Sequence, residues 1–66
     1  MHPATQHLLQ FFTYDHLPDH LKAASQPFAE LANSLARGLP DNPETTACIR
    51  KLLESKDCAV RAVLAK

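Results

Sequence analysis

The stretch Leu39-Pro40-Asp41-Asn42-Pro43-Glu44 decides the fold, because it ends one helix and begins the next. Asn42 is a good N-cap residue, and Pro43 suits the first helical position. Glu44 places a negative charge near the positive end of the helix dipole. No further proline or glycine follows, so the sequence predicts a helix over 43–65.

A second helix is predicted upstream of that turn, over 18–38. Its apolar positions recur at steps of three or four residues and form one stripe: Leu21, Ala24, Phe28, Leu31 and Leu35. Pro27 lies inside this helix, so we expect either a kink near 23–26 or a new helix start with Ser25 as its cap. Gly38, the only glycine in the sequence, is expected to close the helix in a left-handed conformation.

Two long helices joined by a short loop predict an antiparallel hairpin. The residues before it, 1–17, form an N-terminal arm with a short possible helix over 4–12. No alternation of apolar and polar residues indicates a strand. The predicted fold class is therefore all-α, with a short N-terminal helix plus an antiparallel two-helix hairpin in a single domain, 1–66.

Length and charge limit what such a domain can do. A chain of 66 residues buries only about 60% of the surface that its unfolded form exposes, so we expect assembly as a homo-oligomer. Seven basic residues balance seven acidic ones, which leaves no uniform positive field for duplex nucleic acid or a membrane surface. No apolar run approaches the ~20 residues of a membrane span.

Metal and cofactor motifs are not found in the sequence, and we predict neither group. His16 and His20 are four residues apart, but a helix start at Pro18 would place them on different faces. Cys48 and Cys58 would lie ~15 Å apart along one helix, too far for a disulfide. No phosphate loop, paired carboxylates or serine triad is present, so we predict a protein that is not an enzyme.

Lys56 lies among apolar residues of the helix predicted over 43–65. Four such residues share its seam: Ile49, Leu52, Val60 and Val63. An ammonium group on an apolar seam extends to the solvent edge, pairs with an acid or binds an anion. The candidate partners are Asp15, another subunit and a bound phosphate.

A charged face lies opposite this seam. It contains Arg50, Glu54, Asp57 and Arg61, with Lys51 beside them. Their spacing allows the ion pairs Arg50–Glu54 and Asp57–Arg61 on a solvated surface. In an oligomer the same face would line a groove between subunits, where arginine donates forked hydrogen bonds to phosphate.

Aromatic residues gather just before the predicted hairpin: Phe11, Phe12 and Tyr14, followed by His16. Flat rings beside basic groups are suited to hold a nucleobase with its phosphate. The same rings would also fit the open end of a helical hairpin or a subunit interface. Tyr14 is the strongest candidate for ligand contact, because its hydroxyl can also bond phosphate.

Several blocks of the sequence resemble a family of small bacteriophage helical proteins. These blocks are residues 12–18 (FTYDHLP), 25–28 (SQPF), 42–44 (NPE), 50–57 (RKLLESKD) and 60–62 (VRA). The hairpin domain of that family is shared by anti-CBASS and Thoeris anti-defence sponges, and the similarity covers most of residues 11–64. Its better-known members carry an N-terminal tyrosine followed by a lysine. Tyr14 corresponds to the tyrosine, while Lys22, Lys51 and Lys56 are candidates for the lysine.

The resemblance implies a non-enzymatic homo-oligomer, often a hexamer, in the cytoplasm of an infected bacterial host. Its ligand would be a cyclic di- or trinucleotide immune signal, sequestered intact so that host effectors stay inactive. The site residues would be Tyr14 for base stacking, and His16, Arg50, Lys51, Lys56 and Arg61 for phosphate or base edges. Two other functions stay open: a helical protein–protein interaction module without a nucleotide ligand, and a small phosphodiesterase acting on the same signals.

Overall fold

The structure, a computed structural model, describes residues 1–65, and Lys66 at the end of the predicted domain lies outside them. The elements are α1 (Pro3–Leu9), the 3-10 helix η1 (Gln10–Phe12), α2 (Asp19–Gly38) and α3 (Pro43–Ala65). No strand occurs within 1–65, so the predicted all-α class is confirmed.

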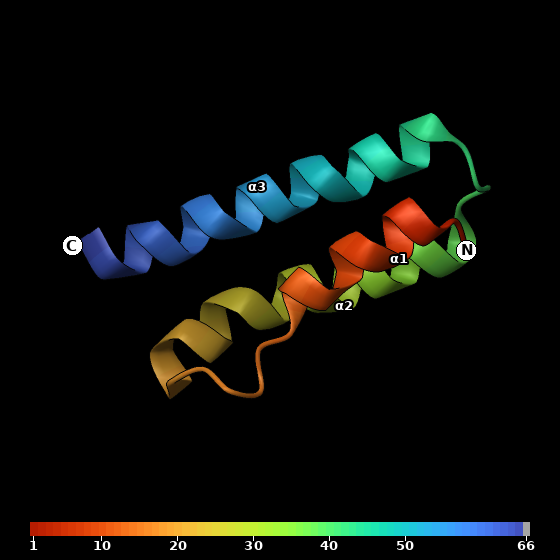
Figure 1. Cartoon of the computed structure of the whole chain (residues 1–66). Helices are drawn as coiled ribbons and strands as arrows, with labels where there is room; N and C mark the ends of the chain where they lie inside the picture. Colours follow the sequence, from red (N-terminus) through yellow and green to blue (C-terminus); the bar gives the residue numbers. More distant parts are fainter. Residues whose placement is uncertain (66) are drawn as a thin grey trace.

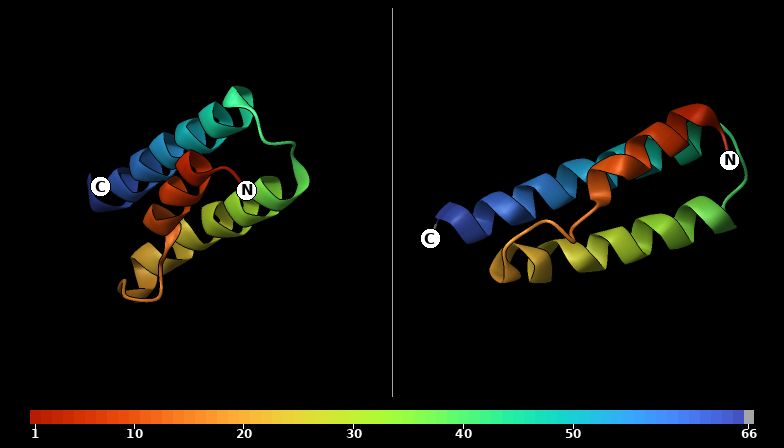
Figure 2. Two further views of the ribbon diagram at one scale, coloured as in Figure 1. Left: turned by 45° about the vertical axis from the view of Figure 1, so that its right-hand side comes forward. Right: turned by 60° about the horizontal axis from the view of Figure 1, so that its bottom comes forward.

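The helices α2 and α3 run antiparallel along most of their length, as predicted (Figure 1). The N-terminal helix α1 continues into η1 and packs against both α2 and α3 (Figure 2). Residues 13–18 continue in the same direction to the open end of the hairpin, where α2 begins and the chain reverses (Figure 1). This path leaves the segment after η1 close to the second half of α3.

The start of α3 follows the capping pattern of the sequence. The Asn42 Oδ1 accepts a hydrogen bond from the Thr45 backbone N–H at 3.0 Å, and Pro43 is the first helical residue. The Thr45 hydroxyl donates to the Pro40 carbonyl, which ties the loop to the first turn of α3. The helix spans the predicted residues 43–65.

The end of α2 differs from the prediction for Gly38. This residue is the last of the helix, and within 1–65 no glycine has a positive φ. Leu39 ends the helix instead, in an extended conformation with φ −91° and ψ 150°, while its N–H donates to the Leu35 carbonyl at 2.9 Å. The residue before a proline avoids the helical region, so Pro40 stops the helix without a left-handed glycine.

Pro27 lies inside α2, and the helix continues through it from Asp19 to Gly38. The alternative of a second helix start with Ser25 as its cap is therefore wrong. The proline removes the donor that would bond the Ala23 carbonyl, but Ala23 is exposed and its carbonyl can bond water instead. The kink near 23–26 stays a prediction.

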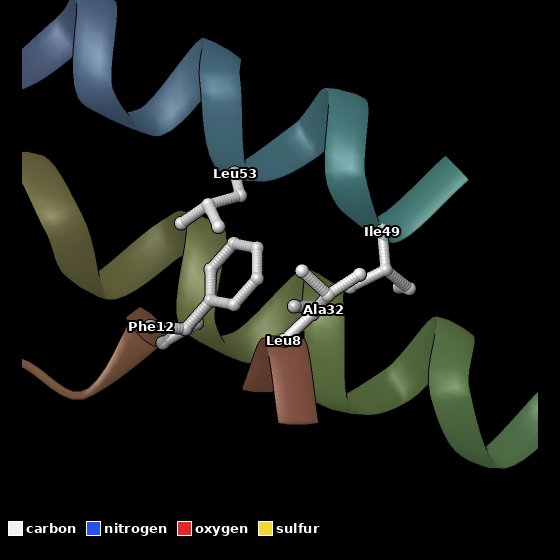
Figure 3. Packing of buried hydrophobic residues seen from close by; sticks show 6 residues of the cluster. Leu8, Phe12, Ala32, Ile49 and Leu53 are labelled. Carbon is white, nitrogen blue, oxygen red and sulfur yellow. The ribbon is translucent and has the colours of Figure 1, made fainter. Parts of the chain in front are cut away.

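The buried face of α2 consists of small residues, not of the predicted stripe of large ones. Ser25, Ala29, Ala32 and Ala36 are buried, whereas Phe28 and Leu35 are only half-buried and Leu31 is 48% exposed. The reason is the N-terminal arm, because Leu8 of α1 and Phe12 of η1 insert between α2 and α3 and leave space only for alanine on α2. The resulting core is shown in Figure 3 and contains Leu8, Phe12, Ala29, Ala32, Ile49 and Leu53.

Two hydrogen bonds fix the beginning of the arm. The His2 imidazole Nδ1 accepts from the Ala4 N–H at 3.0 Å and thereby caps α1, with Pro3 as its first residue. The Thr5 and Thr46 hydroxyls lie 2.9 Å apart and join α1 to α3. The arm is therefore fixed to the hairpin by polar contacts at one end and by the side chain of Phe12 at the other.

The core predicts the effect of truncating Ile49, which is 0% exposed. Ile49→Ala should lower the free energy of unfolding by about 2–5 kcal/mol, because it removes buried methyl groups and leaves a cavity where three helices meet. Leu64→Ala is the matched control, since Leu64 is 62% exposed, and it should change stability by less than about 0.5 kcal/mol. Urea unfolding followed by circular dichroism measures both, and equal midpoints for the two variants would contradict this packing.

Candidate functional site

A groove of about 370 Å³ lies between the segment 10–17 and the second half of α3. Its polar side chains come from four parts of the chain: Gln10 from η1, Thr13 and His16 from the loop, Ser25 from α2, and Lys56, Asp57 and Arg61 from α3. Phe11 lines it with a ring that is 47% exposed. The groove therefore combines cations, a hydroxyl and an aromatic ring on a single chain.

Lys56 connects α3 to the N-terminal arm. Its Nζ donates to the Phe11 carbonyl at 2.9 Å and lies 3.5 Å from the Asp57 Oδ1. The Lys56 side chain is only 14% exposed, and the residue lines the groove. The candidate pairing of Lys56 with Asp15 is thus wrong, because the acidic partner of Lys56 is the neighbouring Asp57. An ammonium has three donors, so these two contacts leave one for a ligand.

Arg61 does not form the ion pair predicted with Asp57. Its Nη1 lies 3.9 Å from the Cys58 Sγ, and within 1–65 Asp57 pairs with Lys56 instead. The predicted pair of Arg50 with Glu54 is also not formed in that part of the chain. Exposed pairs of this kind contribute only a few tenths of a kcal/mol, so spacing alone does not hold them together. One N–H of the Arg61 Nη1 donates to the Cys58 sulfur, and the guanidinium makes no ion pair within 1–65, so its other N–H groups are available for a ligand.

Ser25 is the residue that the sequence analysis missed. The Ser25 residue is 1% exposed. Within 1–65, its Oγ is the one buried side-chain oxygen or nitrogen atom that has no hydrogen-bond partner. It lines the groove from the side of α2. Buried hydroxyls are normally paired, and leaving one unpaired costs about 1–3 kcal/mol. One signal was present in the sequence, because Ser25 lies four residues before Ala29 and so shares the small-residue face of α2.

Tyr14 lies outside this groove. It is half-buried, packs against the core and lines a separate hollow of about 230 Å³ together with Asp15 and Asn33. Arg50 and Lys51 are exposed on α3 and line neither cavity. Of the predicted site residues, the structure therefore brings together His16, Lys56 and Arg61, and it separates the other three from them.

The remaining polar residues form no site within the part of the chain that the structure describes. No group of three His, Cys, Asp or Glu side chains in 1–65 could hold a metal ion. His16 lies in the loop and His20 in α2. Cys48 is half-buried and Cys58 exposed, and both are free thiols. Among these residues, no helix has the length and apolar character needed to cross a membrane.

Comparisons of the chain with protein-family models, curated proteins and solved structures gave no match. The resemblance to anti-defence sponges thus stays a prediction. The functional argument that follows depends on the groove and on the chemistry of its side chains.

The contact between Lys56 and the arm leads to a test on the protein alone. Lys56→Met should keep the helical content but lose the bond to the Phe11 carbonyl, lowering the free energy of unfolding by about 1–2 kcal/mol. Backbone amides of residues 4–17 should then exchange hydrogen faster, as measured by hydrogen–deuterium exchange mass spectrometry. Lys51→Met, at an exposed position of the same helix, is the control. Unchanged protection of the arm in Lys56→Met would show that this bond does not hold it.

Proposed function

We propose that the protein is a non-enzymatic phage counter-defence sponge that binds and sequesters cyclic oligonucleotide immune signals in the cytoplasm of the bacterial host. The observation that carries this proposal is the groove, in which Lys56, Arg61 and His16 lie around the exposed ring of Phe11. The family resemblance of residues 11–64 agrees with it.

The groove residues have the chemistry that a cyclic di- or trinucleotide would need. Arg61 can give two parallel hydrogen bonds to one phosphate, and Lys56 has a donor left for another oxygen. The exposed Phe11 ring offers a flat face for a base, and base–aromatic stacking is worth about 1–3 kcal/mol. The groove would therefore bind a phosphate and the base attached to the same nucleotide at the same time.

The arrangement of Ser25 supports binding without reaction. A serine becomes a nucleophile when an adjacent base accepts its proton. The Ser25 Oγ has no hydrogen-bond partner in the described residues, so no histidine or carboxylate there activates it. Ser25 is therefore not arranged as a nucleophile, which agrees with a sponge that leaves its ligand intact.

The outer flank of α2 supports assembly into a homo-oligomer. Leu31 is 48% exposed and Leu39 is 38% exposed, beside the half-buried Phe28 and Leu35. A second copy of the chain would cover these side chains and add the apolar burial that so short a chain needs. Assembly would also bring further walls to a groove that is open in one chain, and a hexamer is a common form in the family that the sequence resembles.

The same apolar flank favours a second candidate function. A helical interaction module without a nucleotide ligand would use Leu31 and Leu39 to bind an amphipathic helix of another protein. This candidate gives no role to the cations of the groove, which is why we place it second.

Calorimetry with a panel of cyclic di- and trinucleotides tests the proposal. At least one ligand should bind the wild-type protein, and Arg61→Gln should weaken it at least about tenfold, because a hydrogen bond to a charged group is worth roughly 1.5–3 kcal/mol. Arg37→Gln is the matched control, since Arg37 lies in the last turn of α2 near the opposite end of the hairpin. No binding across the panel would overturn the sponge and favour the interaction module.

The fate of the ligand distinguishes a sponge from a phosphodiesterase. After incubation with the protein and heat denaturation, chromatography should recover the cyclic ligand unchanged. A linearised product would show hydrolysis and contradict the proposal. Native mass spectrometry with and without ligand measures the oligomeric state. A monomer in both conditions would contradict the proposed homo-oligomer.

A further inference from the structure

A second cavity lies next to the groove and differs from it in charge. It is the hollow of about 230 Å³ that Tyr14, Asp15 and Asn33 line between the arm and α2. No lysine, arginine or histidine of residues 1–65 lines it, so the Asp15 carboxylate gives it a net negative charge. Thr13 lines both cavities, which makes the hollow a neighbour of the cationic groove.

The size and the walls of the hollow suit one flat ring system. Leu9 and Tyr14 are half-buried and provide most of its apolar surface, above the buried Phe12 and Ala29. Pockets for drug-sized ligands measure about 300–1,000 Å³, so a smaller hollow has room for one base rather than for a whole cyclic dinucleotide. The aromatic ring of Tyr14 offers such a base a flat surface.

The polar groups of the hollow are available to a ligand. The carboxylate of Asp15 is an acceptor only, and Asp15 takes part in no ion pair within 1–65. One N–H of the Asn33 amide donates to the Ala29 carbonyl at 2.8 Å, which leaves its Oδ1 and its second N–H free. Both residues are exposed, so a ligand in the hollow can reach them.

Guanine matches these groups better than adenine does. The Watson–Crick edge of guanine carries two adjacent donors, N1–H and the 2-amino group, beside the acceptor O6. A carboxylate accepts from both donors, and an amide N–H donates to O6. Adenine has the acceptor N1 in place of N1–H and lacks the 2-amino group, so its N1 would face the carboxylate without a proton between them.

We propose that the hollow is a base subsite that selects guanine, in which Asp15 accepts from N1–H and the 2-amino group and Asn33 donates to O6. This inference deepens the proposed function and rests on it for the physiological ligand. A nucleotide with its phosphate in the groove would extend its base past Thr13 into the hollow, and the exposed Phe11 ring would remain for a second base. The preferred signal would then contain at least one guanine.

The test compares three small probes that share a sugar and a phosphate: the 3′,5′-cyclic monophosphates of guanosine, inosine and adenosine. Because their charges are equal, differences in affinity report on the base. Titrations followed by ¹H–¹⁵N NMR should show at least about tenfold tighter binding of the guanosine probe than of the adenosine probe, since a bidentate contact to the base is lost. Inosine keeps N1–H but lacks the 2-amino group, so its affinity should be intermediate.

The same titrations show where the base binds. The guanosine probe should shift the amide signals of residues 13–15 and 29–33, which surround the hollow. Equal affinities for the guanosine and adenosine probes would overturn the inference. A guanosine preference with shifts only outside these two segments would overturn it as well.

Asp15→Asn examines the acceptor of the subsite. The amide has nearly the size of the carboxylate but replaces one acceptor by a donor, so the guanosine and adenosine probes should differ by less than about twofold. Glu30→Gln is the matched control, because it removes the same charge from an exposed position of α2 that does not line the hollow. This control should keep the preference, and an unchanged preference in Asp15→Asn would contradict the role of the carboxylate.

Asn33→Ala examines the donor to O6. It should weaken the guanosine probe by about threefold or more, because one hydrogen bond to the base is lost. Ser34→Ala is the control at the next exposed position of α2, and it should leave the affinity unchanged. Wild-type affinity in Asn33→Ala would contradict the role of the amide. If this variant does not fold, the three probes on the wild-type protein and Asp15→Asn still decide the inference.

Two cyclic dinucleotides separate failure of this inference from failure of the proposed function. Cyclic di-guanosine monophosphate should bind at least about tenfold more tightly than cyclic di-adenosine monophosphate. If both bind equally well, the sponge stands and the guanine subsite is wrong. If the guanosine preference of the small probes and its dependence on Asp15 hold while no cyclic di- or trinucleotide binds, the subsite stands and the sponge is wrong.

Discussion

The packing of Leu8 and Phe12 between α2 and α3 is the interaction on which the rest of the structure depends. Both side chains are almost fully buried, at 2% and 1% exposure, and they meet Ala29 and Ala32 on α2. Large side chains at those alanine positions would leave no room for the arm. Because the arm is held there, the Phe11 carbonyl comes within reach of Lys56, and Thr13, His16 and Leu17 form one wall of the groove.

The groove thus exists because the N-terminal arm, α2 and α3 pack together. Its polar residues are held in place by different contacts. Lys56 is fixed by a backbone carbonyl and a neighbouring carboxylate, Arg61 is unconstrained by an ion pair, and Ser25 is buried without a partner. An unpaired buried hydroxyl costs stability, and functional sites are where proteins commonly retain such costs.

The sequence predicted the elements of this fold better than their packing. The turn around Asn42 and Pro43 depends on local hydrogen bonds and dihedral preferences, so residue types alone indicate where α3 begins. The buried face of α2 depends on which element covers it. The stripe of large apolar residues predicted only the edge of the packed face, where Phe28 and Leu35 contact the core. The buried centre consists of alanines, because the N-terminal arm covers that part of α2.

The same holds for the site: the sequence indicated which residues could bind a ligand, but not which of them lie close together. Lys56 and Arg61 could be selected because they are cations at conspicuous helical positions, but their relation to His16 and Phe11 depends on the path of the arm. Ser25 could not be distinguished from other helical serines without knowing which face is buried. Tyr14 was selected for its chemistry, and the structure places it in a different hollow, packed against the core.

A crystal structure of the protein with a bound cyclic dinucleotide would test the central claim most directly. The account predicts one phosphodiester in the groove, with its oxygens within hydrogen-bond distance of the Lys56 Nζ and of the Arg61 guanidinium. A ligand bound elsewhere, with both of its phosphates distant from Lys56 and Arg61 and the groove free of it, would contradict the account.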